Sequence, residues 1–248
     1  MREADAAVID EAGDAGIPAA SADALLGGRP LLVLAPHPDD ESLGCGALLA
    51  HAFAGPGALV ICLTDGAASH PGSRAVPPDR LAAIRQGEML EAVRLLGGTA
   101  RDVAFLDAPD AGLAPSAALA GRVADLARSG GAGLLLAPSP LDPHRDHVAG
   151  ATIGRDVAGL VPALRLAFYP VWSRWHGRGR APVPPGTSAM RLPLGLHATR
   201  KARAIAAHRS QAGLVVPDDP AGFEMPPGFA DFFATRDEVY LLADGSRP

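Results

Sequence analysis

Residues 31–44 constrain the fold of this chain more than any other stretch. The run LLVLA at 31–35 is continuously apolar, and it is followed by His37 between two prolines and then by three acidic residues at 39–41. A short apolar run bounded by proline is typical of a strand buried on both faces of a parallel sheet. Ligands of open α/β sheets bind at the carboxyl ends of strands, so we expect the imidazole and the carboxylates at such an edge. Neutral imidazole with carboxylate is a ligand set suited to zinc or a related divalent cation.

A second cluster of the same kind lies roughly a hundred residues further on. The apolar run LLLA at 134–137 leads into a loop that carries His144, Asp146 and His147, and a helical pattern follows. A catalytic zinc usually takes three protein ligands and keeps one position open for water. Two clusters at strand ends can supply three ligands and still leave carboxylates and a histidine for proton transfer. This composition is typical of a metallohydrolase site.

Strand and helix patterns alternate along most of the chain. Strands are expected at 31–35, 58–63, 102–106, 133–137 and 165–170, and helices at 42–54, 80–96, 116–129 and 146–158. The alternation predicts βαβ units with right-handed crossovers. We therefore expect an α/β fold, a Rossmann-like and mostly parallel sheet with helices on both faces. A further helix is expected at 201–208, and a final strand, at an edge of the sheet, at 237–243.

One domain is expected over residues 29–248, preceded by a loosely ordered arm at 1–28 that is rich in Ala, Asp and Gly. The segment 171–195 differs in composition from the rest of the chain, and its Gly, Arg and Pro content predicts an irregular loop insertion. Both tryptophans of the chain, Trp172 and Trp175, lie in this segment. They either anchor the insertion by packing or form a wall of a substrate site.

Composition argues against several classes of protein. The net charge is −5, from 22 basic and 27 acidic residues, and no basic block indicates nucleic-acid binding. The apolar runs are far shorter than the roughly 18 residues of a membrane helix. The N-terminus lacks the cationic start and apolar stretch of a secretory signal, which favours a cytoplasmic enzyme. The two cysteines, Cys45 and Cys62, lie in apolar segments and are expected to be small buried hydrophobes.

Taken together, the motifs resemble those of the PIG-L/LmbE family of metal-dependent de-N-acetylases. Besides PHPDDE at 36–41 and HRDH at 144–147, the similarity includes LTDG at 63–66, RQGE at 85–88 and HRSQ at 208–211. Arg145 departs from the family, which commonly has proline there. The resemblance implies an LmbE-like fold and removal of an N-acyl group, usually acetyl, from an N-acetylglucosamine-type substrate.

The resemblance also implies a metal centre and a base. His37, Asp40 and His147 are expected to bind a divalent cation, Zn²⁺ in the first place and Fe²⁺ as an alternative, with water in the open position. Such a cation lowers the pKa of the water and polarises the amide carbonyl. Asp39 is expected to be the general base that takes the water proton and delivers it to the leaving amine.

Further residues have expected roles around this centre. His144, protonated and oriented by Asp146, is expected to stabilise the oxyanion. Arg85 and Asp110 are expected to bind substrate hydroxyls, although Arg85 could instead form an exposed helical ion pair with Glu88.

Two other functions remain open from the residues alone. One is a metal-dependent amidase that acts on a non-sugar amide, and the other is a non-catalytic Rossmann-like ligand-binding module. No GxGxxG fingerprint is present, which counts against a dinucleotide ligand. For a deacetylase, the partner is a small N-acylated amino sugar or glycoconjugate, selected by the loops at 66–79, 107–115 and 171–195.

Overall fold

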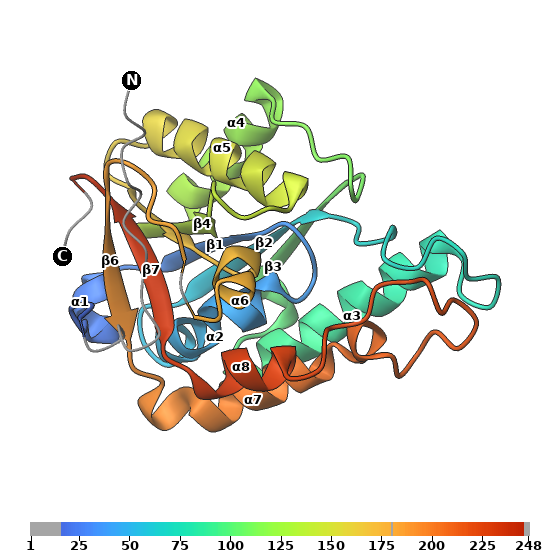
Figure 1. Cartoon of the computed structure of the whole chain (residues 1–248). Helices are drawn as coiled ribbons and strands as arrows, with labels where there is room; N and C mark the ends of the chain where they lie inside the picture. Colours follow the sequence, from blue (N-terminus) through green and yellow to red (C-terminus); the bar gives the residue numbers. More distant parts are fainter. Residues whose placement is uncertain (1–15, 180, 246–248) are drawn as a thin grey trace, which may run out of the picture.

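The computed structural model describes residues 16–179 and 181–245, and these form one seven-stranded sheet with the strand order β3-β2-β1-β4-β5-β7-β6 (Figure 1). The strands are β1 (Leu31–Ala35), β2 (Ala58–Thr64), β3 (Val103–Ala108), β4 (Leu134–Pro138), β5 (Arg165–Tyr169), β6 (Thr187–Leu192) and β7 (Glu238–Ala243). Strands β1 to β5 pair in parallel, whereas β7 is antiparallel to β5 and to β6.

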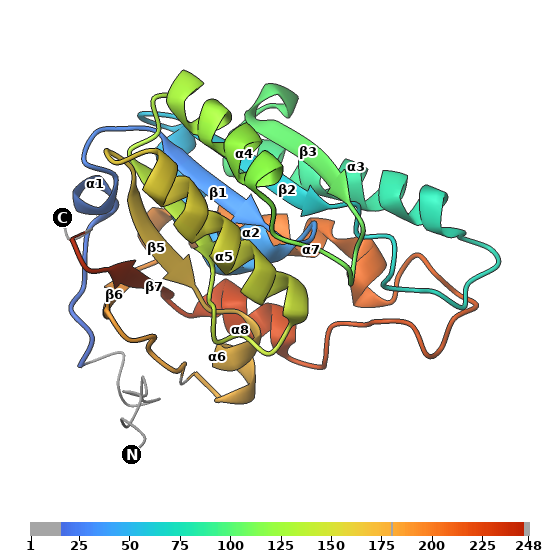
Figure 2. The ribbon, with the colours of Figure 1, turned by 90° about the horizontal axis from the view of Figure 1, so that it is seen from above.

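Helices cover both faces of the sheet (Figures 1 and 2). On one face lie α4 (Ala117–Ser129) and α5 (Arg145–Leu160), and on the other lie α2 (Asp40–Phe53), α3 (Pro78–Leu96), α7 (Ala198–Ala207) and α8 (Phe229–Thr235). Shorter helices are α1 (Ala22–Leu26), α6 (Trp172–His176) and 3₁₀ turns at Ala100–Asp102, Gly195–His197 and Arg209–Ala212. Within the described ranges, no helix combines the length and the apolar character needed to cross a membrane.

Alternate side chains of the central strands enter two separate apolar clusters. Leu31, Val33 and Ala35 pack on the side of α2, and Leu32 and Leu34 pack on the side of α4 and α5. All five residues of β1 are buried, and so are all five of β4. This explains why both strands read as continuous apolar runs, and it confirms the predicted α/β fold. Both cysteines are buried free thiols, as expected.

The strand order reverses between β1 and β4. The chain leaves β1 toward β2 and leaves β4 toward β5, so the two loops diverge at the carboxyl edge of the sheet. A crevice at such a reversal is the usual ligand site of an open α/β sheet. The two polar clusters of the sequence are the loops that follow β1 and β4, so the topology brings them together here.

Two expectations for the second half of the chain are wrong. The segment 171–195 is not an irregular insertion, because it contains α6 and the six-residue strand β6. The final strand, β7, is not at an edge, because β6 pairs with it over 187–192 and covers it. Strand β6 and the interior position of β7 both arise from pairing between segments about fifty residues apart, which local patterns do not reveal.

The N-terminal arm is described only in its second half, since residues 1–15 lie outside the described ranges. Ser21 caps α1, whose Leu25 and Leu26 are buried in the core beside α2. Ala19 forms a bridge to Arg191 of β6. This part of the arm therefore packs onto the domain and is not loosely attached.

Candidate metal and catalytic site

The loop after β1 presents its carboxylates in two different ways. The Asp40 carboxylate closes the loop by accepting a hydrogen bond from the His37 backbone N–H (3.0 Å). Asp39 occupies the N-cap position of α2, yet its side chain makes no capping hydrogen bond to the described helix backbone. Helix capping therefore does not account for Asp39, and its carboxylate faces the cavity described below.

Asp39 has an unusual backbone conformation. Its φ of 147° is one that residues with a side chain seldom adopt. Its N–H donates to Glu41 Oε2 (3.1 Å), and the other oxygen of Glu41 accepts from Ser42 Oγ (2.6 Å) and lies 3.0 Å from His208 Nε2. Glu41 and His208 are both buried behind the loop. They hold the backbone of Asp39 from behind, and His208 is not among the described residues that line the cavity.

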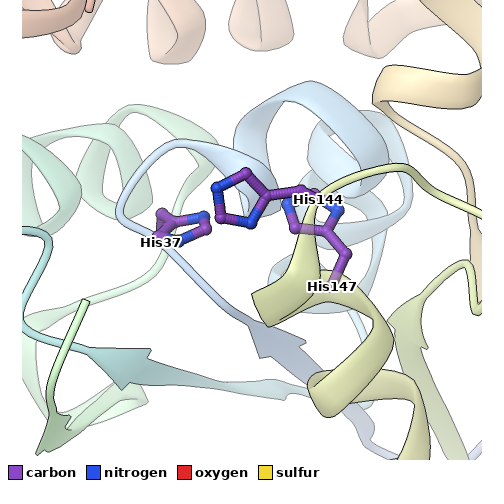
Figure 3. A group of neighbouring side chains, drawn as sticks. All are labelled: His37, His144 and His147. Atoms are coloured by element: carbon purple, nitrogen blue, oxygen red, sulfur yellow. The ribbon is translucent and has the colours of Figure 1, made fainter. Parts of the chain in front are cut away.

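The loop after β4 supplies two histidines at the start of α5. His144 is the N-cap residue, with Nδ1 accepting the Asp146 N–H (3.2 Å), and His147 lies in the first turn. Figure 3 shows both rings beside His37 from the first loop. One nitrogen from each of the three rings lies within 4.8 Å of the others, a spacing that could hold a metal ion.

The Asp40 carboxylate lies between two of these rings. Its oxygens are 3.3 Å from His37 Nδ1 and 3.3 Å from His147 Nε2. The opposite nitrogens face other carboxylates: His147 Nδ1 lies 2.9 Å from Asp142 Oδ2, and His37 Nε2 lies 3.2 Å from Asp146 Oδ2. Carboxylates commonly orient metal-binding imidazoles in this manner.

The donor set fits a divalent cation. His147 Nε2 is fully buried and has no hydrogen-bond partner among the described residues, because its approach to Asp40 lacks hydrogen-bond geometry. A buried nitrogen of this kind needs a partner. A second group of donors, His37, Asp110 and Asp146, overlaps the first through His37. Two imidazoles and a carboxylate at this spacing are ligands suited to Zn²⁺ or Fe²⁺.

The charge balance of the metal-free site also fits a divalent cation. Burial lowers the pKa of His147, but the carboxylates of Asp40 and Asp142 outweigh it and raise that pKa to about 9. Burial also lowers the pKa of His37, but hydrogen bonds to Asp110, Asp146 and Asp40 outweigh burial and raise that pKa well above its usual value. Imidazolium ions thus balance the carboxylates here. Because metal ligation needs neutral imidazole, a cation that takes over this role would release protons.

Asp39 has the electrostatics of a base. Burial raises its pKa to about 6, against the opposing effect of the Arg85 guanidinium. Arg85 itself donates to Gly66 O (2.9 Å) and Pro38 O (3.0 Å) and lies 3.5 Å from Asp39 Oδ2. Arg85 is buried and forms no described ion pair with Glu88, so the alternative of an exposed helical pair is wrong. It joins the loops after β1 and β2 beneath Asp39.

Asp146 does not orient His144 in the expected way. Its carboxylate accepts the N–H groups of Ala111 (2.8 Å) and Leu113 (3.1 Å) and faces His37. Burial and the neighbouring imidazoles lower the pKa of His144, which disfavours the expected protonated form in the metal-free chain. Because Nδ1 of His144 accepts a backbone hydrogen bond, the neutral ring carries its proton on Nε2.

A cavity of about 470 Å³ opens beside these groups. Its polar side is lined by His37, Asp39, Asp40, Arg85, Asp110 and His144, with Ser69 and Gln211 adjoining, and its apolar side by Leu43, Trp172, Phe223, Met225 and Phe229. The expected loops at 66–79 and 107–115 contribute, but 171–195 contributes only Trp172. The 221–229 segment was not expected, although its Phe, Met and Pro content signalled an apolar surface.

Asp110 is expected to contact substrate hydroxyls, and its carboxylate already has partners. One oxygen accepts the Ala68 N–H (2.9 Å), and the other lies 3.2 Å from His37 Nε2. These contacts place Asp110 at the boundary between the candidate metal donors and the open cavity. The hydrogen bond to Ala68 also joins the loops that follow β2 and β3.

Asp142 is a further residue that sequence reasoning missed. Besides orienting His147, its buried carboxylate accepts the N–H groups of Val171 (3.0 Å), Trp172 (3.2 Å) and Ser173 (2.9 Å) at the start of α6. One carboxylate therefore fixes both His147 and a wall of the cavity. The signal that could have found it was its place in the same strand-end loop as His144 and His147.

Comparisons with known proteins agree with this geometry. The family model of GlcNAc-PI de-N-acetylase (PIG-L) matches residues 32–158, just over half of the chain. A 1D-myo-inositol 2-acetamido-2-deoxy-alpha-D-glucopyranoside deacetylase of Kineococcus radiotolerans is 40% identical over 86 residues. That alignment covers 33% of this chain and 23% of the relative, so the chain matches less than a quarter of that protein.

Two solved structures share the fold. The N,N'-diacetylchitobiose deacetylase of Pyrococcus horikoshii is 21% identical, with a TM-score of 0.64 over 90% of this chain and 86% of that one. The conserved protein TT1542 of Thermus thermophilus is 27% identical, with a TM-score of 0.62 over 88% of this chain and 95% of that one. The expected family fold is confirmed.

Proposed function

The chain belongs to the GlcNAc-PI de-N-acetylase (PIG-L) family, and on this premise we propose that it is a metal-dependent N-deacetylase of a small amino-sugar-containing molecule. The proposed catalytic unit is residues 29–248. The observation that carries the proposal is the pair of histidines whose inward nitrogens flank Asp40 while their outward nitrogens face carboxylates. A non-catalytic binding module has no need of such an arrangement.

We assign His37, Asp40 and His147 as the metal ligands, with Zn²⁺ as the proposed ion and Fe²⁺ as the alternative. Asp40 is preferred over His144 because its two oxygens lie between the other two donors, 3.3 Å from each. His144 already uses Nδ1 to accept a backbone hydrogen bond. Its remaining nitrogen is then available to substrate.

When bound, the cation lowers the pKa of the attacking water and polarises the amide carbonyl. Asp39 accepts a proton from the water as the oxygen adds to the amide carbon. The same carboxyl then donates this proton to the nitrogen as the C–N bond breaks. The products are a carboxylate, usually acetate, and a free amine. Asp39 suits both steps because a pKa of about 6 lies near the working pH of a general acid–base group.

The oxyanion and the sugar are assigned to other residues of the cavity. Neutral His144, with its proton on Nε2, donates to the developing oxyanion. Asp146 supports this centre by holding His37 rather than His144. Arg85 and Asp110 line the cavity next to Asp39 and His37, where they can meet sugar hydroxyls. A non-sugar amide substrate would use the same metal and base, so substrate assay must separate the two.

Metal content and amine release test this function. Purified wild-type protein should carry about one divalent ion per chain, measured by inductively coupled plasma emission spectrometry. It should also release the free amine from N-acetylglucosamine or its glycosides. His37→Ala, Asp40→Ala and His147→Ala should lose the metal, whereas His144→Ala should keep it and lose activity.

Different outcomes contradict different parts of the proposal. Retention of stoichiometric metal by both His37→Ala and His147→Ala would overturn the ligand assignment. Loss of metal in His144→Ala, with retention in Asp40→Ala, would move the third ligand to His144. Turnover of N-acetylated non-sugar amines alone would leave a metal-dependent amidase.

A further inference from the structure

We propose that the apolar side of the cavity is a subsite for an aromatic or aliphatic aglycone, carried on the same sugar whose N-acyl group is cleaved. This inference rests on the proposed function and names the substrate class more closely. We call Trp172, Phe223, Met225 and Phe229 the aromatic wall.

The aromatic wall is a continuous surface built from separate elements. Trp172 stands at the start of α6, Phe229 begins α8, and Phe223 lies in the segment that leads to α8 (Figure 1). The Trp172 ring centre is 4.9 Å from that of Phe229 and 5.8 Å from that of Phe223. Trp172 and Phe223 are only partly buried, and both line the cavity.

Backbone hydrogen bonds hold the aromatic wall in place. The Trp172 N–H donates to Asp142, and the Phe223 N–H donates to Ser69 O (2.7 Å). The Met225 N–H donates to Gln211 O (2.7 Å). A wall fixed before the ligand arrives loses little conformational freedom on binding, which favours affinity.

The end of the 216–225 segment farther from the cavity is also fixed. The Asp218 carboxylate accepts from Ser73 Oγ (2.6 Å) and from the N–H groups of Arg74 and Ala75 (2.9 Å each). Asp219 accepts the Gly72 N–H (2.8 Å). These hydrogen bonds attach the segment to the loop after β2. The segment that carries Phe223 and Met225 of the aromatic wall is therefore fixed at both ends.

Size and chemistry limit what can occupy this space. A volume of about 470 Å³ lies in the range of roughly 300–1,000 Å³ typical of sites for whole small molecules, and is far more than an acetyl group needs. Sugar hydroxyls find polar partners in Asp110, Ser69 and Gln211. The aromatic wall offers sugar hydroxyls almost no hydrogen-bond partners. An entirely polar substrate would therefore leave this apolar surface exposed to water.

The position of the aromatic wall favours the aglycone over the acyl chain. The amide carbon must lie near Asp39 and Asp40, the carboxylates that line the cavity beside His37. Phe223 and Met225 of the aromatic wall instead adjoin Ser69 and Gln211, to which their backbone N–H groups donate. A substrate whose hydroxyls meet these polar groups therefore directs its next substituent onto Phe223 and Trp172.

Binding of product-like glycosides tests the subsite without requiring turnover. We would measure the methyl and phenyl β-glycosides of glucosamine by calorimetry against the metal-loaded protein. The phenyl glycoside should bind about tenfold or more tightly, as expected for burial of an apolar group in a fitted pocket. In Trp172→Ala and Phe223→Ala the ratio of the two affinities should fall toward one.

The matched control is Trp175→Ala. Trp175 packs on Phe229 (5.2 Å) and Phe232 (5.5 Å) in the same aromatic cluster, but it is not among the described residues that line the cavity. The control should keep the wild-type affinity ratio. Equal binding of the two glycosides to the wild type, or an equal loss of the ratio in Trp175→Ala, would overturn the subsite.

An acyl series separates the two possible occupants and the two proposals. We would compare kcat/KM for the N-acetyl and N-hexanoyl derivatives of the methyl glycoside. Any gain from the longer acyl chain should be the same in the wild type and in Trp172→Ala. A gain that Trp172→Ala abolishes would assign the aromatic wall to the acyl group and overturn the inference. If the phenyl glycoside binds preferentially but no N-acetyl glycoside is hydrolysed, the proposed function fails while the apolar subsite stands.

Discussion

At the scale of single residues, Asp39 combines backbone strain with a carboxylate that lines the cavity beside Arg85 and does not cap its helix. A non-glycine residue in a sparsely populated conformation costs about 1–3 kcal/mol and persists only when its surroundings hold it. Here Glu41 accepts the Asp39 N–H, and His208 and Ser42 fix Glu41 in turn. The conformation directs the carboxylate away from the helix it would otherwise cap and toward the cavity.

The raised pKa of Asp39 leads to a pH prediction. A base must be ionised, so kcat/KM should fall as the Asp39 carboxylate gains its proton and should level off at higher pH. The pKa of Asp39 is about 6 without the cation, and a neighbouring divalent cation lowers it, so the fall should lie at or below pH 6. Asp39→Asn should keep its metal and lose about 10²–10⁴-fold in kcat. The control is Asp125→Asn, on the exposed face of α4. An unchanged acidic limb in the residual activity of Asp39→Asn would assign this titration to another group.

At the scale of elements, α2 approaches the sheet closely enough to require glycine. A Cβ added to Gly44 would lie 2.3 Å from the Tyr169 ring. That ring is buried in β5, and its hydroxyl donates to Leu34 O (2.7 Å), so it has little room to move. Because α2 begins at Asp40, the close packing also determines where Asp40 lies relative to β1 and β4.

Two glycine-to-alanine changes should therefore have opposite effects on stability. Gly44→Ala should lower the free energy of unfolding by about 1–3 kcal/mol, the usual cost of overpacking. Gly121→Ala, in α4, meets nothing within 4 Å and should raise stability by about 0.5–1 kcal/mol because alanine favours helix. Denaturant unfolding of the two variants measures both signs. A neutral Gly44→Ala would mean that α2 can move off Tyr169 without loss.

At the scale of the whole molecule, a buried ion pair connects the C-terminal elements to α2. Lys201 Nζ of α7 lies 2.7 Å from Glu238 Oε1 at the start of β7. Glu238 also accepts the N–H groups of Ala47 (2.7 Å) and Leu48 (3.0 Å) in α2 and the Tyr240 hydroxyl (2.6 Å). Lys201 and Glu238 are almost completely buried.

Removal of the Lys201 charge should destabilise the whole fold. Lys201→Met leaves the Glu238 carboxylate buried without its cation, which typically costs about 3–5 kcal/mol. The double variant Lys201→Met with Glu238→Gln should regain part of this loss, because no unpaired charge remains. Arg94→Met breaks an exposed pair with Glu91 and should change the melting temperature little. If Lys201→Met and Arg94→Met changed the melting temperature equally, the Glu238 carboxylate would have to be hydrated and not buried without a partner.

Much of this molecule follows from local patterns along the chain. The runs at 31–35 and 134–137 predict buried parallel strands because strands covered on both faces have no polar side. The histidines and acids at 36–41 and 144–147 follow these strands directly. A parallel sheet brings the carboxyl ends of its strands to one edge, so the meeting of the two clusters is predictable from their places in the sequence.

Other features depend on partners far away in the chain. Asp142 reaches the N–H groups of residues 171–173, Glu41 reaches His208, and Phe223 joins Ser69. Each contact spans tens of residues or more and uses a backbone group, a cavity edge or a buried side chain that has no periodicity. Strand β6 likewise forms because β7 supplies its hydrogen bonds, and not because of its own composition. Local sequence patterns therefore predict the candidate reactive groups. Packing between distant segments determines which carboxylate contacts which imidazole and which apolar side chains line the cavity.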